Sequence, residues 1–101
     1  MRFIKATNLK KDLENVPESV KKSALSWLDV VDSKELVWNS LIDIRQTYAS
    51  ADRVGKLYVF DLSKGYRIIV GIGFKRRVIY YKAILSHSEY EKGTWKSKYS
   101  Q

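Results

Sequence analysis

Several residue types that support common functions are absent or rare in this chain. It contains no cysteine, one histidine and one proline among its 101 residues. Without cysteine there are no disulfides and no thiolate chemistry, and a zinc site would need carboxylates for all but one of its ligands. We therefore expect neither a metal ion nor a cofactor.

Long apolar runs are also missing. No segment approaches the ~18–20 apolar residues that a membrane-spanning helix requires. Residues 1–5 lack the apolar stretch that characterises a signal peptide. These absences predict a cytoplasmic protein that does not cross a membrane.

Acidic residues become scarce in the second half of the chain. Residues 1–55 hold 9 Lys/Arg and 8 Asp/Glu, a net charge of +1, whereas residues 56–101 hold 10 and 3, a net charge of +7. This basic half predicts a polyanionic partner such as RNA, although charge alone leaves an acidic protein or an anionic membrane surface open. The size of the chain predicts one domain spanning residues 1–101.

Apolar residues recur at helical spacing in the first half. Two stripes on either side of Pro17 predict a helical hairpin, with Thr7 or Asn8 as possible caps. Its apolar positions are Leu9, Leu13, Val16, Val20, Ala24, Trp27, Leu28 and Val31. A third helix is expected from a cap at Ser33 to about Tyr48, followed by a connection over residues 49–55.

From Leu57 onward the apolar period changes to two, which predicts antiparallel strands over residues 57–62, 66–74 and 77–85. The fold class is therefore α+β, with the helices packed on one face of the sheet. The tail over residues 92–101 is expected to be a short helix or a frayed end.

A two-residue loop at Lys75 and Arg76 would pair Gly71 with Tyr80 and give the last two strands two distinct faces. The expected core face carries Tyr66, Ile68, Val70, Ile72, Phe74, Ile79, Tyr81, Ala83 and Leu85. The other face carries Arg67, Ile69, Gly71, Gly73, Tyr80 and Lys82. Its two glycines would let a ligand approach closely, so we expect a groove there. Because the loop lacks an Asn-Gly signature, a longer loop with a shifted register is the alternative.

Metal-independent RNA cleavage needs a proton acceptor, a proton donor and a cation near the phosphate. His87 is the candidate acid or base, and Arg67 could hold the scissile phosphate in bidentate fashion. The alternatives are a surface or packing histidine and an Arg67 paired with Asp61 across the strands. Tyr90 could stack on a base or donate its hydroxyl, or be a core tyrosine. Lys92 could be a second cation or an acid, or simply a solvated lysine.

Further basic and aromatic residues follow the last hairpin. Lys75, Arg76 and Arg77 could position phosphates, or form a solvated turn. Tyr80 and Lys82 fit a nucleic-acid surface, and equally an ordinary exposed sheet face.

Several stretches together resemble the HigB-type toxins of type II toxin–antitoxin systems, within the RelE/ParE-like superfamily. They are Trp38 with Asp43-Ile44, Ala51-Asp52-Arg53-Val54, Val59-Phe60-Asp61-Leu62, Gly65-Tyr66-Arg67-Ile68-Ile69-Val70 and His87-Ser88-Glu89-Tyr90-Glu91-Lys92. The resemblance implies N-terminal helices on one face of a three- to four-stranded antiparallel, RelE-like sheet. Arg67, His87, Tyr90 and Lys92 match the motif, with Lys75, Arg76 and Arg77 as weaker RNA contacts.

The resemblance also implies an mRNA interferase, an endoribonuclease that cuts messenger RNA on translating ribosomes through attack of the 2′-hydroxyl on the adjacent phosphate. Its implied partners are that mRNA and a HigA-type helix-turn-helix antitoxin, with operator DNA bound only through the antitoxin complex and no membrane. Related toxins that poison DNA gyrase share the fold without cleaving RNA. The alternatives are therefore a non-catalytic nucleic-acid-binding module and a gyrase-directed toxin.

Overall fold

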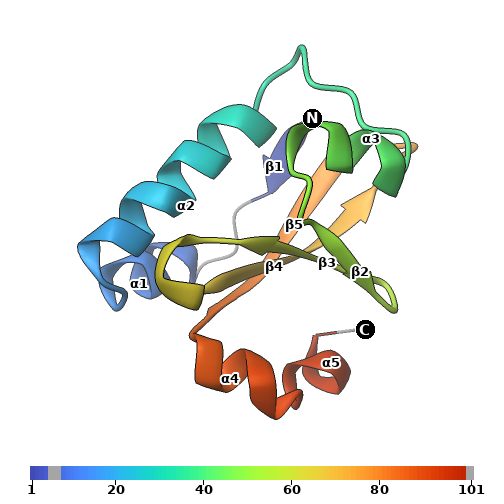
Figure 1. The fold of residues 1–101 in the computed structure, drawn as a ribbon. Helices are drawn as coiled ribbons and strands as arrows, with labels where there is room; N and C mark the ends of the chain where they lie inside the picture. Colours follow the sequence, from blue (N-terminus) through green and yellow to red (C-terminus); the bar gives the residue numbers. More distant parts are fainter. Residues whose placement is uncertain (5–7, 100–101) are drawn as a thin grey trace.

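A computed structural model describes residues 1–4 and 8–99, which form one five-stranded sheet with helices on both faces (Figure 1). The elements in chain order are β1 (Arg2–Ile4), α1 (Leu9–Glu14), α2 (Glu18–Val31), α3 (Leu41–Thr47), β2 (Asp52–Val54), β3 (Leu57–Asp61), a 3₁₀ turn η1 (Ser63–Gly65), β4 (Arg67–Gly73), β5 (Val78–Leu85), α4 (His87–Lys92) and α5 (Trp95–Lys98). The strand order is β1-β5-β4-β3-β2. Within these described ranges no helix is long and apolar enough to cross a membrane.

The predicted helical hairpin is present as α1 and α2. Its apolar stripe is buried, with Val20, Ala24 and Val31 fully inaccessible and Trp27 only 2% exposed. The Tyr81 hydroxyl donates a 2.6 Å hydrogen bond to Asp12 and joins α1 to β5. Burial, followed by this bond, raises the pKa of Tyr81. Of the two possible caps, Asn8 makes no side-chain capping bond and Thr7 lies outside the described residues.

The third helix begins later than predicted. Its N-cap is Ser40, whose hydroxyl accepts a hydrogen bond from the Asp43 backbone N–H, so residues 33–40 lie outside it. The reason is the burial of Trp38, which stacks on Phe60 at a ring distance of 5.8 Å before the helix starts. α1, α2, α3 and this segment cover one face of the sheet. We call the apolar cluster on that face the helix-side core; its buried residues include Val20, Ala24, Trp27, Val31, Trp38, Ile44, Phe60, Ile68, Val70, Ile79 and Tyr81.

Two short strands were not predicted, and they bring the sheet to five strands where three or four were expected. β1 pairs in parallel with β5, and β2 pairs with β3 where the sequence predicted only a connection. Each has three residues, too few for alternating polarity to appear in the sequence. The α+β class and the antiparallel order of β3, β4 and β5 are confirmed.

The predicted hairpin register holds near the turn and fails farther along. Gly71 pairs with Tyr80 as predicted, and Arg77 donates to the Phe74 carbonyl across the two-residue loop. Between Ile69 and Val70 the ladder shifts, because β5 has one extra residue there, Lys82.

This β-bulge corrects the predicted faces of β5. Ala83 and Leu85 were expected in the helix-side core but lie on the opposite face, while Ile84 packs against the helix-side core instead.

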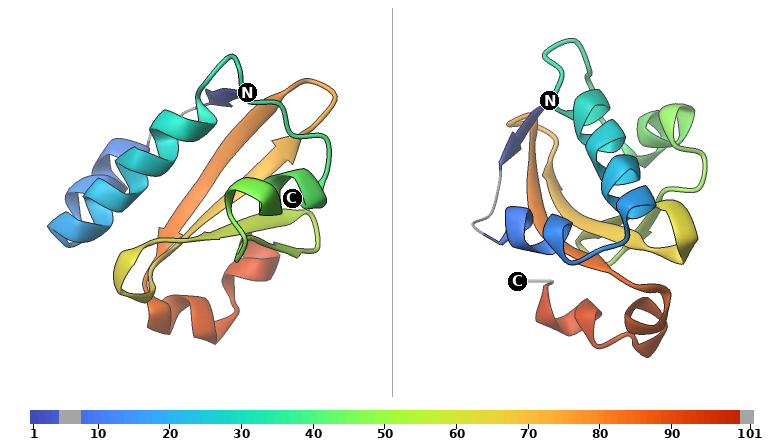
Figure 2. Two further views of the ribbon diagram at one scale, coloured as in Figure 1. Left: turned by 45° about the horizontal axis from the view of Figure 1, so that its top comes forward. Right: turned by 90° about the vertical axis from the view of Figure 1, so that its left-hand side faces the viewer.

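The opposite face is covered at one end by α4 and α5 (Figures 1 and 2). Ser86 and Glu89 form a capping box that starts α4, and Gly93 in a left-handed conformation ends it. Trp95, 2% exposed, packs there. Its cluster, the C-terminal core, contains the buried residues Leu57, Val59, Ile69, Ala83, Leu85 and Trp95. The helical alternative for the tail is confirmed at residues 95–98, while residues 100–101 lie outside the description.

Candidate functional site

Two of the four predicted catalytic residues, Arg67 and His87, lie against Gly65, and a third, Tyr90, lies against Arg67. Arg67 Nη1 donates to the Gly65 carbonyl at 2.7 Å. A Cβ added to Gly65 would lie 3.2 Å from His87 Cβ and 3.5 Å from His87 Nδ1. Gly65 has a φ of +76°, a left-handed conformation that favours glycine. Gly65, the last residue of η1, therefore lies between the start of β4 and the start of α4.

Arg67 lies on the same side of the sheet as α4 and is held in place from several directions. Its Nε lies 2.8 Å from Asp61, its cross-strand partner, and Nη1 also donates to the Tyr66 carbonyl at 3.2 Å. Its guanidinium carbon lies 5.0 Å from the centre of the Tyr90 ring. The alternative reading of Arg67 as a partner of Asp61 is therefore correct for the free protein, and its side chain is only 21% exposed.

Tyr90 connects this cluster to the C-terminal core. Its ring stacks on Trp95 at 5.2 Å, and its backbone carbonyl accepts a hydrogen bond from the Trp95 indole N–H. Burial raises the pKa of Tyr90, with nearby carboxylates adding to the effect and Arg67 opposing it. At neutral pH its hydroxyl is therefore protonated and can act as a proton donor. We call Arg67, His87 and Tyr90 the Gly65 cluster.

His87 is the most accessible member of the Gly65 cluster. It occupies the first position of α4, and its side chain is 62% exposed, with Nε2 3.8 Å from Glu91. Its imidazole is therefore open to solvent close to Gly65, whose carbonyl Arg67 binds, and an exposed imidazole can accept or donate a proton.

Lys92 and the hairpin turn lie apart from the Gly65 cluster. Lys92 borders a different hollow, with Glu89, Trp95 and Lys98. Lys75, Arg76 and Arg77 are exposed at the far end of β4, which at ~3.3 Å per residue is about 20 Å from Arg67. Arg77 borders a hollow at the edge of the sheet together with Met1, Arg2, Asp32, Lys34 and Leu36.

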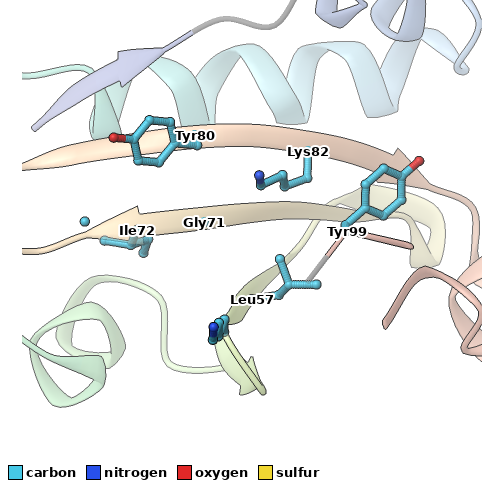
Figure 3. A pocket seen from close by; sticks show the side chains of 8 residues that line it. Leu57, Gly71, Ile72, Tyr80, Lys82 and Tyr99 are labelled. Carbon is cyan, nitrogen blue, oxygen red and sulfur yellow. The ribbon is translucent and has the colours of Figure 1, made fainter. Parts of the chain in front are cut away.

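The predicted groove over the two strand glycines is present as a hollow of 340 Å³, which we call the β4–β5 hollow (Figure 3). Its lining residues are Lys56, Leu57, Gly71, Ile72, Gly73, Tyr80, Lys82 and Tyr99. Tyr80 and Lys82 thus lie on the predicted face of the sheet, although Lys82 is the extra residue of the bulge and does not pair with Ile69 as its register predicted. Lys56 and Tyr99 were not predicted, because one comes from the β2–β3 turn and the other from the end of the chain.

No group of three or more His, Asp or Glu side chains in residues 1–4 and 8–99 is arranged to hold a metal ion.

Comparisons with known proteins identify a family for the sequence and a related fold for the structure. A family model described as HigB_toxin, RelE-like toxic component of a toxin-antitoxin system, matches residues 20–93. A solved archaeal RelE–RelB complex from Pyrococcus horikoshii OT3 contains a chain with the same fold, at a TM-score of 0.60 and 19% identity over 85% of this chain and 93% of that one. No curated protein matches the sequence.

Proposed function

We propose that this chain, which belongs to the HigB family of RelE-like toxic components of toxin–antitoxin systems, is an endoribonuclease that cleaves messenger RNA on translating ribosomes in the cytoplasm. The observation that supports this most directly is that Arg67 and His87, from two separate segments, both lie against Gly65, and that the Tyr90 ring lies against Arg67. These are the group types that phosphodiester cleavage through the 2′-hydroxyl requires.

In the proposed reaction the ribose 2′-hydroxyl loses its proton, and its oxygen attacks the adjacent phosphorus to form a 2′,3′-cyclic phosphate. The bond from phosphorus to the 5′ oxygen breaks, and that oxygen takes up a proton. His87 acts as acid or base because imidazole exchanges protons near neutral pH and this one is exposed. Arg67 stabilises the charge that develops on the phosphate, and Tyr90 donates a proton or orients the base.

The other basic residues have a supporting role in this proposal. Lys75, Arg76, Arg77, Tyr80 and Lys82 would bind the RNA strand away from the reacting phosphate. Lys92 remains a candidate second cation, although its side chain borders the hollow beside Trp95 and not the Gly65 cluster.

We further propose an antitoxin partner for this chain. The archaeal RelE chain of the same fold was solved together with RelB. For this chain the expected partner is a HigA-type helix-turn-helix protein, which would bring the complex to operator DNA.

The test is cell-free translation of a defined mRNA, with new RNA ends mapped by primer extension. We expect the parent chain to cut within translated codons and His87→Ala to cut on the order of 10²–10⁴ times more slowly. Ser88→Ala is the matched control, because Ser88 is the next exposed residue in the same helical turn. The free energy of unfolding of both variants should stay within about 0.5 kcal/mol of that of the parent chain.

Two results would contradict the proposal. Cleavage at the parental rate by His87→Ala would remove the imidazole from the mechanism. RNA binding without any cleavage by the parent chain, even with ribosomes, would indicate the non-catalytic binding module. Undisturbed translation would instead indicate a gyrase-directed toxin.

A further inference from the structure

The β4–β5 hollow lies on the sheet face away from α1 and α2, beside the part that α4 and α5 cover. In Figure 3, Lys82 lies between Tyr80 and Tyr99 along the hollow, and Leu57 lies across from them. Gly71 is four residues from Arg67 on β4, about 13 Å at ~3.3 Å per residue. The β4–β5 hollow is therefore a separate site from the Gly65 cluster, on the same sheet face.

The two glycines that line the hollow are not required by the backbone. Neither has a positive φ, unlike Gly55, Gly65 and Gly93. A Cβ on Gly71 would make ordinary contact with Lys82 Cε at 3.6 Å, whereas one on Gly73 would come within 3.2 Å of Val78 Cγ2. Glycine inside a strand weakens the strand and commonly marks a place where a ligand approaches the backbone.

The lining of the hollow matches a nucleotide in chemistry. It contains two lysines, two tyrosines and the apolar side chain of Leu57, and no carboxylate. Ile72 borders the hollow from β4 between the two glycines, while its side chain packs against the helix-side core. Within the described ranges neither Lys56 nor Lys82 forms an ion pair. Lys82 is the extra residue of the bulge, and bulges commonly redirect a side chain beside a functional site.

We propose that the β4–β5 hollow binds one nucleobase of the RNA strand that is cut at the Gly65 cluster, several positions from the scissile phosphate. The base packs over the Gly71–Gly73 backbone against the Tyr80 ring, and Lys56 and Lys82 contact the flanking phosphates. This inference rests on the proposed function for the identity of the strand as RNA. It predicts that the choice of cleavage position depends partly on a base that is not adjacent to the cleaved bond.

The experiment measures binding of the labelled full chain to ribosomes programmed with mRNA whose riboses in the decoding region carry 2′-O-methyl groups, which block cleavage. One series of mRNAs lacks a single base at successive positions. For the parent chain we expect one position, away from the scissile bond, where the missing base weakens binding on the order of 10-fold, the range of base–aromatic stacking.

The decisive comparison is a double-mutant cycle with Gly71→Leu, which fills the hollow without changing charge. This variant should bind intact mRNA as weakly as the parent binds the abasic one, and the missing base should weaken it no further. Gly71→Ala, for which a Cβ fits, should weaken binding less than Gly71→Leu does. It keeps the test valid if the leucine variant does not fold. Lys22→Ala, exposed on α2, should behave like the parent.

The inference is wrong if removing the base weakens binding equally in the parent and in both glycine variants. It is also wrong if no abasic position weakens binding of the parent chain, or if the parent chain does not bind these ribosomes. Cleavage of unmodified mRNA is scored separately. A chain that cleaves but shows no such coupling would keep its proposed function and lose this site. A chain that shows the coupling but does not cleave would keep the site and lose the nuclease proposal.

Discussion

The guanidinium of Arg67 has little free hydrogen-bonding capacity. Nε faces Asp61 at 2.8 Å, and Nη1 donates to two backbone carbonyls. Among the described residues Nη2 has no hydrogen-bond partner. A phosphate can therefore meet Arg67 through Nη2 alone, or displace the half-exposed Asp61 carboxylate to form the bidentate pair predicted from the sequence. In the free protein these contacts already fix the position of the guanidinium.

Tyr90 permits a test of a single atom. Tyr90→Phe keeps the ring that stacks on Trp95 and lies under Arg67, so its free energy of unfolding should change by less than about 0.5 kcal/mol. If the hydroxyl donates the proton to the leaving oxygen, the cleavage rate should fall about 10²-fold. Since the pKa of Tyr90 is raised above its ordinary value near 10, this donor stays protonated throughout neutral and mildly alkaline pH.

The measurement is single-turnover cleavage of ribosome-bound mRNA from pH 6 to about pH 9, a range chosen to stay below the ordinary tyrosine pKa. Tyr90→Ala is the companion variant, and it should lose activity and also about 2 kcal/mol of stability by removing the ring. If the phenylalanine variant cleaves at the parental rate, the Tyr90 hydroxyl is not the proton donor, and the role of Tyr90 is to pack its ring against Arg67 and Trp95.

At the scale of elements, the bulge in β5 explains where sequence reasoning succeeded and where it failed. Alternation predicted the three long strands, the two-residue loop and the Gly71–Tyr80 pair, because these depend on local periodicity. It could not predict the extra residue at Lys82, since the shift places Ala83 and Leu85 against Trp95, which comes from another segment. β1 and the start of α3 were missed for the same reason: their positions depend on distant partners.

Deleting Lys82 tests the bulge. Without it, Ala83 would still pair with Ile69 and would still face the C-terminal core, in a regular ladder. We expect this deletion to cost less than about 1.5 kcal/mol, measured by urea unfolding. Deleting Ala83 instead should cost at least about 3 kcal/mol, because it moves the Lys82 ammonium into the buried position beneath Trp95. Equal costs would mean that the bulge does not decide which residue faces that core.

At the scale of the whole molecule, the fold separates the proposed reacting groups from much of the positive charge. The Gly65 cluster lies at one end of β4 and the Lys75–Arg76 turn at the other, with the β4–β5 hollow between them. Arg67, His87 and Tyr90 were predicted from their residue types and from the resemblance, and in the fold the 3₁₀ turn η1 and the start of α4 bring Arg67 and His87 against Gly65. Lys56, in the β2–β3 turn, and Tyr99, which follows α5, meet at the hollow only in the folded chain, so no local sequence pattern predicts them.

This arrangement makes the position of a charge matter more than its number. Replacing Lys75 and Arg76 by alanine and replacing Lys10 and Lys11 by alanine each lower the net charge from +8 to +6, with all four side chains exposed. Each phosphate contact on a single strand contributes about 0.7 to the slope of log affinity against log salt. The turn variant should therefore bind mRNA-programmed ribosomes with a slope smaller by about 1.4, while the α1 variant should keep the parental slope. Equal slopes in the two variants would show that the turn acts only through overall charge, and would remove Lys75 and Arg76 from the RNA-binding surface.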